Sequence, residues 1–288
     1  MPLHQSLAAN QIESIVGILN GTTNYILSQM TETGVNYADA LADAQKQGFA
    51  EADPTNDVCG FDSARKLAIL SSIGFRANVT FDDVLVEGIE KIDKSDIQYA
   101  KEMGYTIKLL TVALRQENGI ALNVYPAFLP DDHPLSSVKG SYNAIYVTGN
   151  IVDDVMFYGR GAGALPTASA VMGDVISTAQ HILNGSTGTG MIMTDTKRIP
   201  FYSSLKLQNS YYFRLDVDDV TGVLSQIASA FAEHEISICE VVQKRKAKGV
   251  AELVLITEMA SRESILHVEK ALQVLPCMRK VANVIRVM

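Results

Sequence analysis

The sequence lacks several features that would place it in large classes of protein. No apolar run approaches the roughly 20 residues of a membrane-spanning helix, and the first residues lack the basic and apolar segments of a secretion signal. The three cysteines (Cys59, Cys239 and Cys277) are an odd number at wide spacings without a CxxC pair. We therefore expect small apolar core cysteines, no metal site, no membrane partner and a cytoplasmic location.

Clustered positive charge is also scarce. The formal net charge is −8, from 24 Lys and Arg against 32 Asp and Glu, without long runs of either sign. Nucleic-acid affinity comes largely from clustered Lys and Arg, so a nucleic-acid partner is not expected. The basic residues within 244–248 are interpreted as a solvated hairpin turn ending at Gly249, with a nucleic-acid site as the less favoured alternative.

At 288 residues and 47% apolar composition, the chain is long enough for a sizeable core and for two domains. Its first part combines helical periodicity with later β-branched stretches. The expected helices are 37–48, about 62–73 and 168–183, and the expected strands are 106–115, 120–127 and 143–148. This pattern predicts an α+β domain with a helix-covered antiparallel or mixed sheet over residues 1–200.

The last 80 residues have a different order of elements. We expect strands at 211–217, 237–243, 251–257 and 281–287, and helices at 222–234 and 262–275. Asp219 and Ser261 precede the two helices as candidate caps. The order βαββαβ predicts a ferredoxin-like domain over residues 208–288, after a linker between 184 and 208 that is rich in Gly, Ser and Thr at its start.

One loop between two predicted helices carries four acids beside a lysine. Asp62 and Lys66 lie four residues apart on a helix, so their side chains share a face. Spacing alone favours a surface ion pair over a functional site. Asp53 precedes Pro54 and is interpreted as a turn residue.

Three segments together resemble the signatures of the homoserine dehydrogenase family, in the family's order and at similar separations. They are Gly-Ile-Leu-Asn-Gly-Thr-Thr-Asn-Tyr-Ile-Leu at 17–27, the acidic loop at 51–66, and the glycine turn and helix start at 159–170. The resemblance covers essentially the whole chain, because the C-terminal part resembles an ACT domain. It implies NAD(P)-dependent interconversion of L-aspartate 4-semialdehyde and L-homoserine, in the biosynthesis of threonine, methionine and isoleucine.

The resemblance also implies roles for individual residues. Lys66 resembles the catalytic lysine, which would protonate the aldehyde oxygen, and Asp62 would hold both Lys66 and the substrate hydroxyl. Glu51 matches the acid that binds the substrate's α-amino group, and Asp57 is expected to support it. Residues 20–24 match the family as well, although Asn, Gly and Thr there are interpreted as ordinary caps and turns.

A cofactor site is only partly represented in the sequence. Gly161 and Gly163 permit close backbone approach before a helix start, and by resemblance they contact the cofactor within a nucleotide-domain segment at 159–183. The GxGxxG fingerprint of a dinucleotide-binding domain is absent. We therefore expect a natural or engineered fragment, or a separate polypeptide that supplies that domain, with no turnover and weak or no NAD(P)H binding by this chain alone.

The C-terminal part is expected to bind a regulatory amino acid. Asp219, Gly222, Val223 and Leu224 fit the ACT loop, whose free amides at a helix start can bind a carboxylate. Thr221 stands where the family more often has proline. By resemblance threonine is the expected effector and a homodimer or homotetramer the expected assembly. A ferredoxin-like unit used only for dimerisation stays open as the alternative.

Two classes of function are consistent with these patterns. One is an oxidoreductase fragment with an attached sensor, and the other is a non-catalytic amino-acid-sensing ACT module. Glu51, Asp62 and Lys66 all remain at the motif's spacing, which favours the enzyme.

Overall fold

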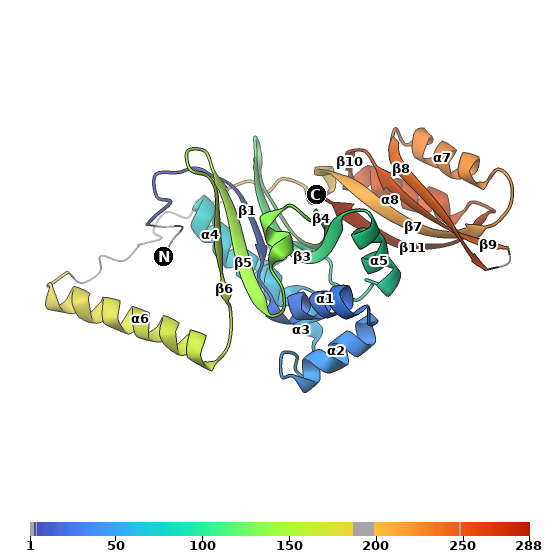
Figure 1. The fold of residues 1–288 in the computed structure, drawn as a ribbon. Coiled ribbons are helices and arrows are strands. Elements are labelled where there is room, and N and C mark those ends of the chain that lie inside the picture. The colour runs from blue at the N-terminus through green and yellow to red at the C-terminus, as the bar shows by residue number, and fades with distance from the viewer. Residues whose placement is uncertain (1–2, 4, 187–198, 248) are drawn as a thin grey trace.

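One continuous sheet runs through the computed structural model, which describes residues 3, 5–186, 199–247 and 249–288 (Figure 1). The strand order is β6-β5-β1-β3-β4-β11-β7-β9-β8, and the short strands β2 and β10 pair with β4 and β7. The strands of the first part are β1 (Ile12–Ile18), β2 (Leu85–Val86), β3 (Tyr105–Gln116), β4 (Gly119–Pro130), β5 (Tyr142–Gly149) and β6 (Asp153–Arg160). The sheet is mixed, because β2 and β11 pair with β4 in parallel and the other neighbours are antiparallel.

Helices cover one face of the first part of this sheet. They are α1 (Gly21–Thr33), α2 (Tyr37–Lys46), α3 (Thr55–Val58), α4 (Phe61–Phe75) and α5 (Lys94–Glu102). Short 3₁₀ turns are η1 (Phe81–Asp83), η2 (Pro134–Ser137) and η3 (Ser204–Lys206). The main core lies between these helices and the inner side chains of β1, β3 and β4, and a second apolar cluster packs under η2 on the opposite face. The predicted helix-covered mixed sheet is therefore confirmed.

Four elements of at least seven residues in the first part were not predicted, namely β1, α1, α5 and β6. In β1 the neighbouring residues Ile15 and Val16 are both buried, because β1 lies between β5 and β3 with side chains packed on both faces. A strand buried on both faces shows no polar alternation, and periodicity then cannot distinguish it from a buried helix.

The C-terminal part has the predicted ferredoxin-like arrangement. It contains β7 (Gln208–Asp218), α7 (Val223–Glu233), β8 (Ile238–Ala247), β9 (Val250–Thr257), β10 (Ala260–Ser261), α8 (Arg262–Gln273) and β11 (Met278–Val287). The spatial order β11-β7-β9-β8 is that of a βαββαβ unit, with α7 and α8 packed on one face. Ser261 caps α8 by accepting from the Ser264 amide at 3.0 Å, as predicted.

Two details of the sequence analysis were wrong. The residue that caps α7 is Gly222, with no side-chain cap, so Asp219 does not fill that position. Of the three cysteines only Cys277 is a buried core residue, since Cys59 is half-buried and Cys239 is exposed. Local patterns placed the helices and strands of the C-terminal part and the Ser261 cap, but they did not identify the residue that caps α7.

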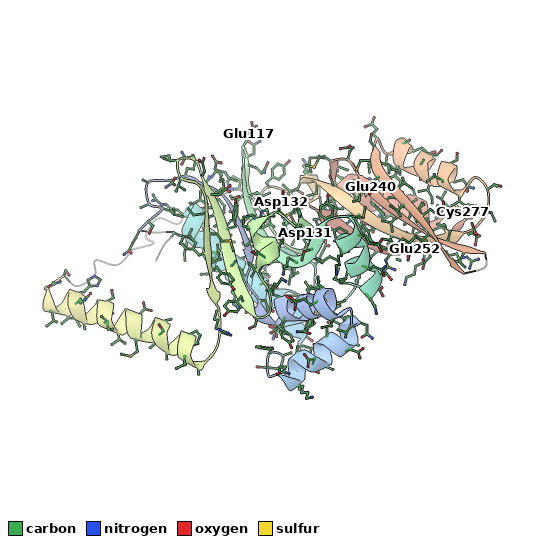
Figure 2. All side chains as sticks on the ribbon, viewed as in Figure 1. Glu117, Asp131, Asp132, Glu240, Glu252 and Cys277 are labelled. Carbon is green, nitrogen blue, oxygen red and sulfur yellow. The ribbon has the colours of Figure 1, made fainter. Side chains whose placement is uncertain are left out.

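A buried charged cluster joins the two parts of the chain. The second face of the C-terminal sheet packs on α5, where Asp96 is fully buried and accepts from Arg214 Nε at 2.7 Å. Tyr212 and Asn283 also donate to Asp96, at 3.1 and 2.7 Å. Glu252, labelled in Figure 2, accepts from the Tyr99 hydroxyl of α5 at 2.8 Å. This contact between the C-terminal sheet and α5, called the seam below, is therefore a cluster of buried charged and polar groups that hydrogen-bond to one another.

The helix α6 (Ala164–Leu183) stands apart from the rest of the structure (Figure 1). It begins four residues before the predicted start at 168, and none of its twenty residues is buried. Large apolar side chains such as Leu165 and Leu183 are more than four-fifths exposed. Among the described residues, no helix is both long and apolar enough to span a membrane.

Candidate active site

A single asparagine joins the two aspartates of the acidic loop. Asn20 Nδ2 donates to Asp57 Oδ1 at 2.7 Å and to Asp62 Oδ2 at 2.9 Å. The same residue caps α1, because its Oδ1 accepts from the Thr23 amide at 2.8 Å. The cap predicted for residues 20–24 is therefore present, and Asn20 also fixes the separation between Asp57 at the end of α3 and Asp62 in the first turn of α4.

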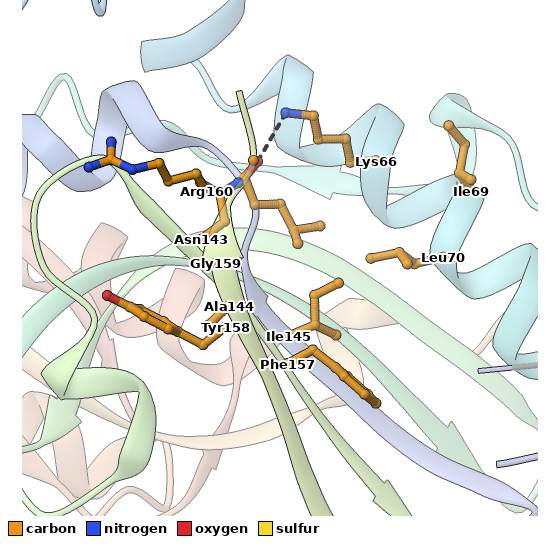
Figure 3. A pocket seen from close by; sticks show the side chains of 12 residues that line it. Lys66, Ile69, Leu70, Asn143, Ala144, Ile145, Phe157, Tyr158, Gly159 and Arg160 are labelled. Atoms are coloured by element: carbon orange, nitrogen blue, oxygen red, sulfur yellow. Dashed lines mark hydrogen bonds between the residues drawn. The ribbon is translucent and has the colours of Figure 1, made fainter. Parts of the chain in front are cut away.

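Lys66 lies one helical turn after Asp62. Its Nζ donates to Asp62 Oδ2 at 2.7 Å and to the Leu19 carbonyl oxygen at 3.0 Å. The dashed line in Figure 3 marks the bond to Leu19. The Lys66 side chain is 45% exposed, so the ammonium is oriented by two acceptors while remaining open to a third.

The ion pair lies on the wall of a polar cavity of about 650 Å³. One side of this cavity is the acidic loop with Glu51, Asp57 and Asp62, and the other includes Asn143 of β5 and the glycine turn after β6. Within the described part of the chain the Glu51 carboxylate has no hydrogen-bonding or ionic partner. The cavity thus presents one uncommitted carboxylate beside a bridged pair of aspartates.

Asp53 has the local role that the sequence predicted. Its carboxylate accepts from the Thr55 amide at 3.1 Å and from the Thr55 hydroxyl at 2.6 Å. These hydrogen bonds lower the pKa of Asp53. Asp53 therefore stabilises the turn before α3, although it also borders the cavity.

A second, mostly apolar cavity of about 420 Å³ meets the first at Lys66. Figure 3 shows the side chains of Ile69, Leu70, Ile145 and Phe157 gathered on one side of it. Both cavities are bordered by Lys66, Asn143, Arg160 and Gly161. Lys66 therefore lies where the polar cavity meets the more open, apolar one.

Of the two predicted cofactor glycines, Gly161 borders both cavities and Gly163 borders the polar one. A Cβ on Gly161 would come within 2.6 Å of Asn143 Nδ2, so a side chain there would displace the asparagine. Gly163 has φ +116°, a conformation that favours glycine, and it is the residue before α6. The turn thus brings bare backbone to the rim of the polar cavity.

Sequence reasoning missed three residues of the site. The bridging role of Asn20 was not seen, because a capping asparagine gives no local signal of a second use. Asn143 and Arg160 flank both cavities, and the Arg160 guanidinium lies 4.7 Å from the centre of the Tyr142 ring. They reach the site only through the pairing of β5 with β6, which no sequence spacing encodes.

The loop predicted to bind an effector lies at the start of α7. Gly222 has φ +87°, and no side chain caps the helix. Val223 is buried beneath it, whereas Leu224 is 46% exposed.

Among the described residues, no group of three or more His, Cys, Asp or Glu side chains is arranged to hold a metal ion.

Fold and site together define a class: an α+β domain whose cavity is lined by a lysine and several carboxylates, joined through one sheet to a ferredoxin-like unit. The homoserine dehydrogenase family model matches residues 1–176 and the ACT domain model matches residues 211–277. The chain belongs to the homoserine dehydrogenase family and carries a C-terminal ACT domain.

Individual relatives agree with this assignment. The homoserine dehydrogenase of Corynebacterium glutamicum is 42% identical over 290 residues, covering 99% of this chain and 64% of the relative. The crystal structure of a homoserine dehydrogenase from Thiobacillus denitrificans matches with a TM-score of 0.93 and 35% identity, covering 100% of this chain and 66% of that chain. A hyperthermophilic archaeal homoserine dehydrogenase mutant in complex with NADPH matches with a TM-score of 0.53 and 27% identity, over 62% of this chain and 51% of that chain. The chain thus spans slightly less than two thirds of the length of its first relatives.

Proposed function

We propose that this chain provides the substrate-binding and proton-transfer half of an NAD(P)-dependent homoserine dehydrogenase, which interconverts L-aspartate 4-semialdehyde and L-homoserine. The observation that carries the proposal is the placement of Lys66. Its ammonium is held by Asp62 and the Leu19 carbonyl at the junction of a polar and an apolar cavity.

The proton step follows from this geometry. In the reductive direction the substrate aldehyde would lie with its oxygen near Lys66 Nζ, and the bound nicotinamide would supply a hydride to the carbon. Lys66 donates its proton to that oxygen as negative charge develops there, and Asp62 keeps the ammonium oriented. In the oxidative direction the neutral amine takes the proton back from the hydroxyl of homoserine.

The other end of the substrate is a zwitterionic amino acid. The uncommitted carboxylate of Glu51 is suited to its α-ammonium group through a charge-assisted hydrogen bond. Asp57, bridged to Asp62 through Asn20, supports the same end of the cavity. The cavity therefore offers separate positions for the amino group and for the reacting carbon.

The residues at the junction fit a nicotinamide. The apolar cavity beside Lys66 suits a flat ring, and Gly161, which borders it, lets the Asn143 side chain pack directly on its backbone. Gly161 and Gly163 would contact the cofactor within the segment 159–183. Most cofactor contacts would come from protein outside these residues. The exposed apolar side chains of α6 support this proposal, because such a surface is suited to packing against further protein.

The C-terminal unit is proposed to bind a regulatory amino acid, with threonine as the first candidate. Gly222 opens α7 without a side-chain cap, which leaves helix-start amides for a carboxylate. Asp219, Val223 and Leu224 would complete the loop. Residues 1–200 and 208–288 would thus act as substrate and effector units of a homo-oligomer.

Binding to the isolated chain tests the substrate assignment. Calorimetric titration should detect binding of homoserine to the unsubstituted chain. Glu51→Gln should raise the dissociation constant about tenfold or more, because the variant loses a charged hydrogen bond. Asp53→Asn is the matched control, because it alters a neighbouring acid that only stabilises a turn. Equal affinity for homoserine in all three proteins would contradict the role of Glu51.

Reconstitution tests the enzymatic assignment against a purely sensing module. The chain is mixed with the nucleotide-binding portion of a relative, and NADPH oxidation by aspartate semialdehyde is followed. Turnover that Lys66→Ala abolishes supports the enzyme, whereas threonine binding without turnover supports the sensing module. The chain alone should bind NADPH weakly, and micromolar affinity in a nicotinamide fluorescence titration would contradict the proposed division of the cofactor site.

A further inference from the structure

The end of β11 reaches the acidic loop through a short chain of contacts that the proposed chemistry does not use. Arg286 is 4% exposed, and its guanidinium donates to both Glu87 oxygens, at 3.0 and 2.9 Å. It also lies 4.1 Å from the centre of the buried Tyr125 ring. This two-pronged, stacked arrangement fixes the Glu87 side chain in position and orientation.

Glu87 begins a segment that packs directly on the backbone of the acidic loop. Its amide donates to the Val124 carbonyl at 2.8 Å, which holds the segment to the edge of β4. A Cβ on the next residue, Gly88, would lie 2.3 Å from the Val58 carbonyl oxygen, so the two backbones touch without an intervening side chain. The Ile89 amide then donates to that same carbonyl at 2.8 Å.

The contacted residues lie between the two aspartates of the site. Val58, Cys59 and Gly60 connect Asp57 at the end of α3 to Asp62 in α4. The Cys59 thiol donates to Glu90 at 3.1 Å, and Gly60 (φ +82°) packs between Val86 and Val124. Any shift of segment 87–90 therefore moves the backbone that sets the spacing of the acids bridged by Asn20.

We propose that Arg286 of the ACT unit is a positioning residue for the substrate site: by clamping Glu87 it holds segment 87–90 against residues 58–60 and so fixes Asp57 relative to Asp62. This inference deepens the proposed function and rests on it for the identity of the ligand. The clamp also gives the ACT unit a direct contact path to the acidic loop, because Arg286 lies on a strand of that unit.

A second buried arginine of the ACT unit provides a matched comparison. Arg214 is 6% exposed and also grips a carboxylate across the seam, donating to Asp96 with two nitrogens at 2.7 and 3.3 Å. Asp96 lies in α5, beyond the segment that touches Val58. Arg286→Lys and Arg214→Lys therefore remove the same kind of two-pronged contact from the same interface, and only the first lies on the path to the site.

Amide hydrogen exchange of the full chain, read by mass spectrometry, tests the positioning without any ligand. In Arg286→Lys the amides of Cys59, Gly60 and Ile89 should exchange about tenfold faster than in the unsubstituted chain, because the local opening becomes easier. In Arg214→Lys the acceleration should appear in α5 instead. Unchanged exchange at residues 58–60 and 89 in Arg286→Lys, or equal acceleration there in both variants, would overturn the proposal.

Homoserine titration gives the second readout. Arg286→Lys should raise the dissociation constant about tenfold to a hundredfold, the range expected when binding groups are misplaced, and Arg214→Lys should leave it near that of the unsubstituted chain. Glu87→Gln, which keeps the shape of the clamp but not its charge, should fall between. Equal affinity in both arginine variants overturns the proposal, whereas absence of homoserine binding to the unsubstituted chain contradicts the proposed function and leaves the exchange result to decide the positioning.

Discussion

The first turns of α4 and α5 each hold an aspartate that pairs with a cation, and the two pairs differ in almost every other respect. The side chains of Asp62 and Lys66 are 32% and 45% exposed; both border the polar cavity, and Lys66 also borders the apolar one. The side chains of Asp96 and Arg214 are 0% and 8% exposed, and Tyr212 and Asn283 also donate to Asp96. One helix start thus keeps its charges available for a ligand, and the other uses them to join two parts of the chain.

Removing the lysine of the exposed pair should give the largest effect. Lys66→Met removes the proposed proton donor, so the reconstituted enzyme should lose about 10² to 10⁴ in kcat for NADPH oxidation. Its free energy of unfolding should change by about 0.5 kcal/mol or less, because the pair is solvent-exposed. The control is Lys46→Met, an equivalent change at the end of α2. A kcat within threefold of the unsubstituted enzyme would rule out general acid catalysis by Lys66.

Removing the aspartate of the buried pair should instead have its large effect on the free energy of unfolding. Asp96→Ala leaves Arg214 buried without its main partner, which should lower the free energy of unfolding by about 3 to 5 kcal/mol in urea titrations. The double variant Asp96→Leu with Arg214→Met should recover only part of that loss, because Tyr212 and Asn283 lose their acceptor and Glu252 loses its cation. A loss below about 1 kcal/mol in the single variant would show that the cluster contributes little to holding the seam.

The sequence predicted the exposed pair better than the buried one, because the two residues of the exposed pair are close together in the sequence. Asp62 and Lys66 are four residues apart on one helix, so spacing alone placed them together. Asp96 and Arg214 are 118 residues apart and meet only because the ACT sheet lays one face on α5. The parallel pairing of β11 with β4, which creates that arrangement, has no local signal in either strand.

The same limit applies within the site. Lys66, Asp62, Glu51 and Asp57 lie within one sixteen-residue segment and were proposed from the family resemblance of that segment, whereas Asn143 and Arg160 reach the cavity through strand pairing. Asn20 was expected to cap a helix. Because capping already explained an asparagine at that position, its hydrogen bonds to Asp57 and Asp62 were not predicted. Burial alone does not separate the predicted elements from the missed ones, because the largely buried β3 and β4 were predicted whereas α5 and β6, each with exposed positions, were not.

A buried lysine differs from both pairs, because in the described part of the chain its ammonium contacts no carboxylate and the cost of burying it depends on pH. Lys108 is 2% exposed and donates to Asn24 Oδ1 at 3.0 Å and to the Val138 carbonyl oxygen. Burial, reinforced by nearby Lys139, lowers its pKa from 10.5 to about 8. Between those values the unfolded chain binds more protons than the folded chain, so stability rises with pH.

Comparison with Lys108→Met isolates this group. The free energy of unfolding of the unsubstituted chain minus that of the variant should increase by roughly 3 kcal/mol from pH 7 to pH 10.5, as the cost of burying the ammonium disappears. Other titrating groups cancel in the difference. A difference that stays flat across this range would show that Lys108 keeps its proton in the folded chain.

The smallest effect is expected at an exposed pair on the same strand as Arg286. Arg279 Nε donates to Asp218 at 2.6 Å, a shorter contact than either bond from Arg286 to Glu87, yet its side chain is 49% exposed. Water screens this pair, so Arg279→Ala should lower the free energy of unfolding by no more than about 1 kcal/mol and should leave homoserine affinity unchanged. If Arg279→Ala destabilised the chain as strongly as Asp96→Ala, distance rather than burial would govern these pairs. The contrast between α4 and α5 would then lose its physical basis.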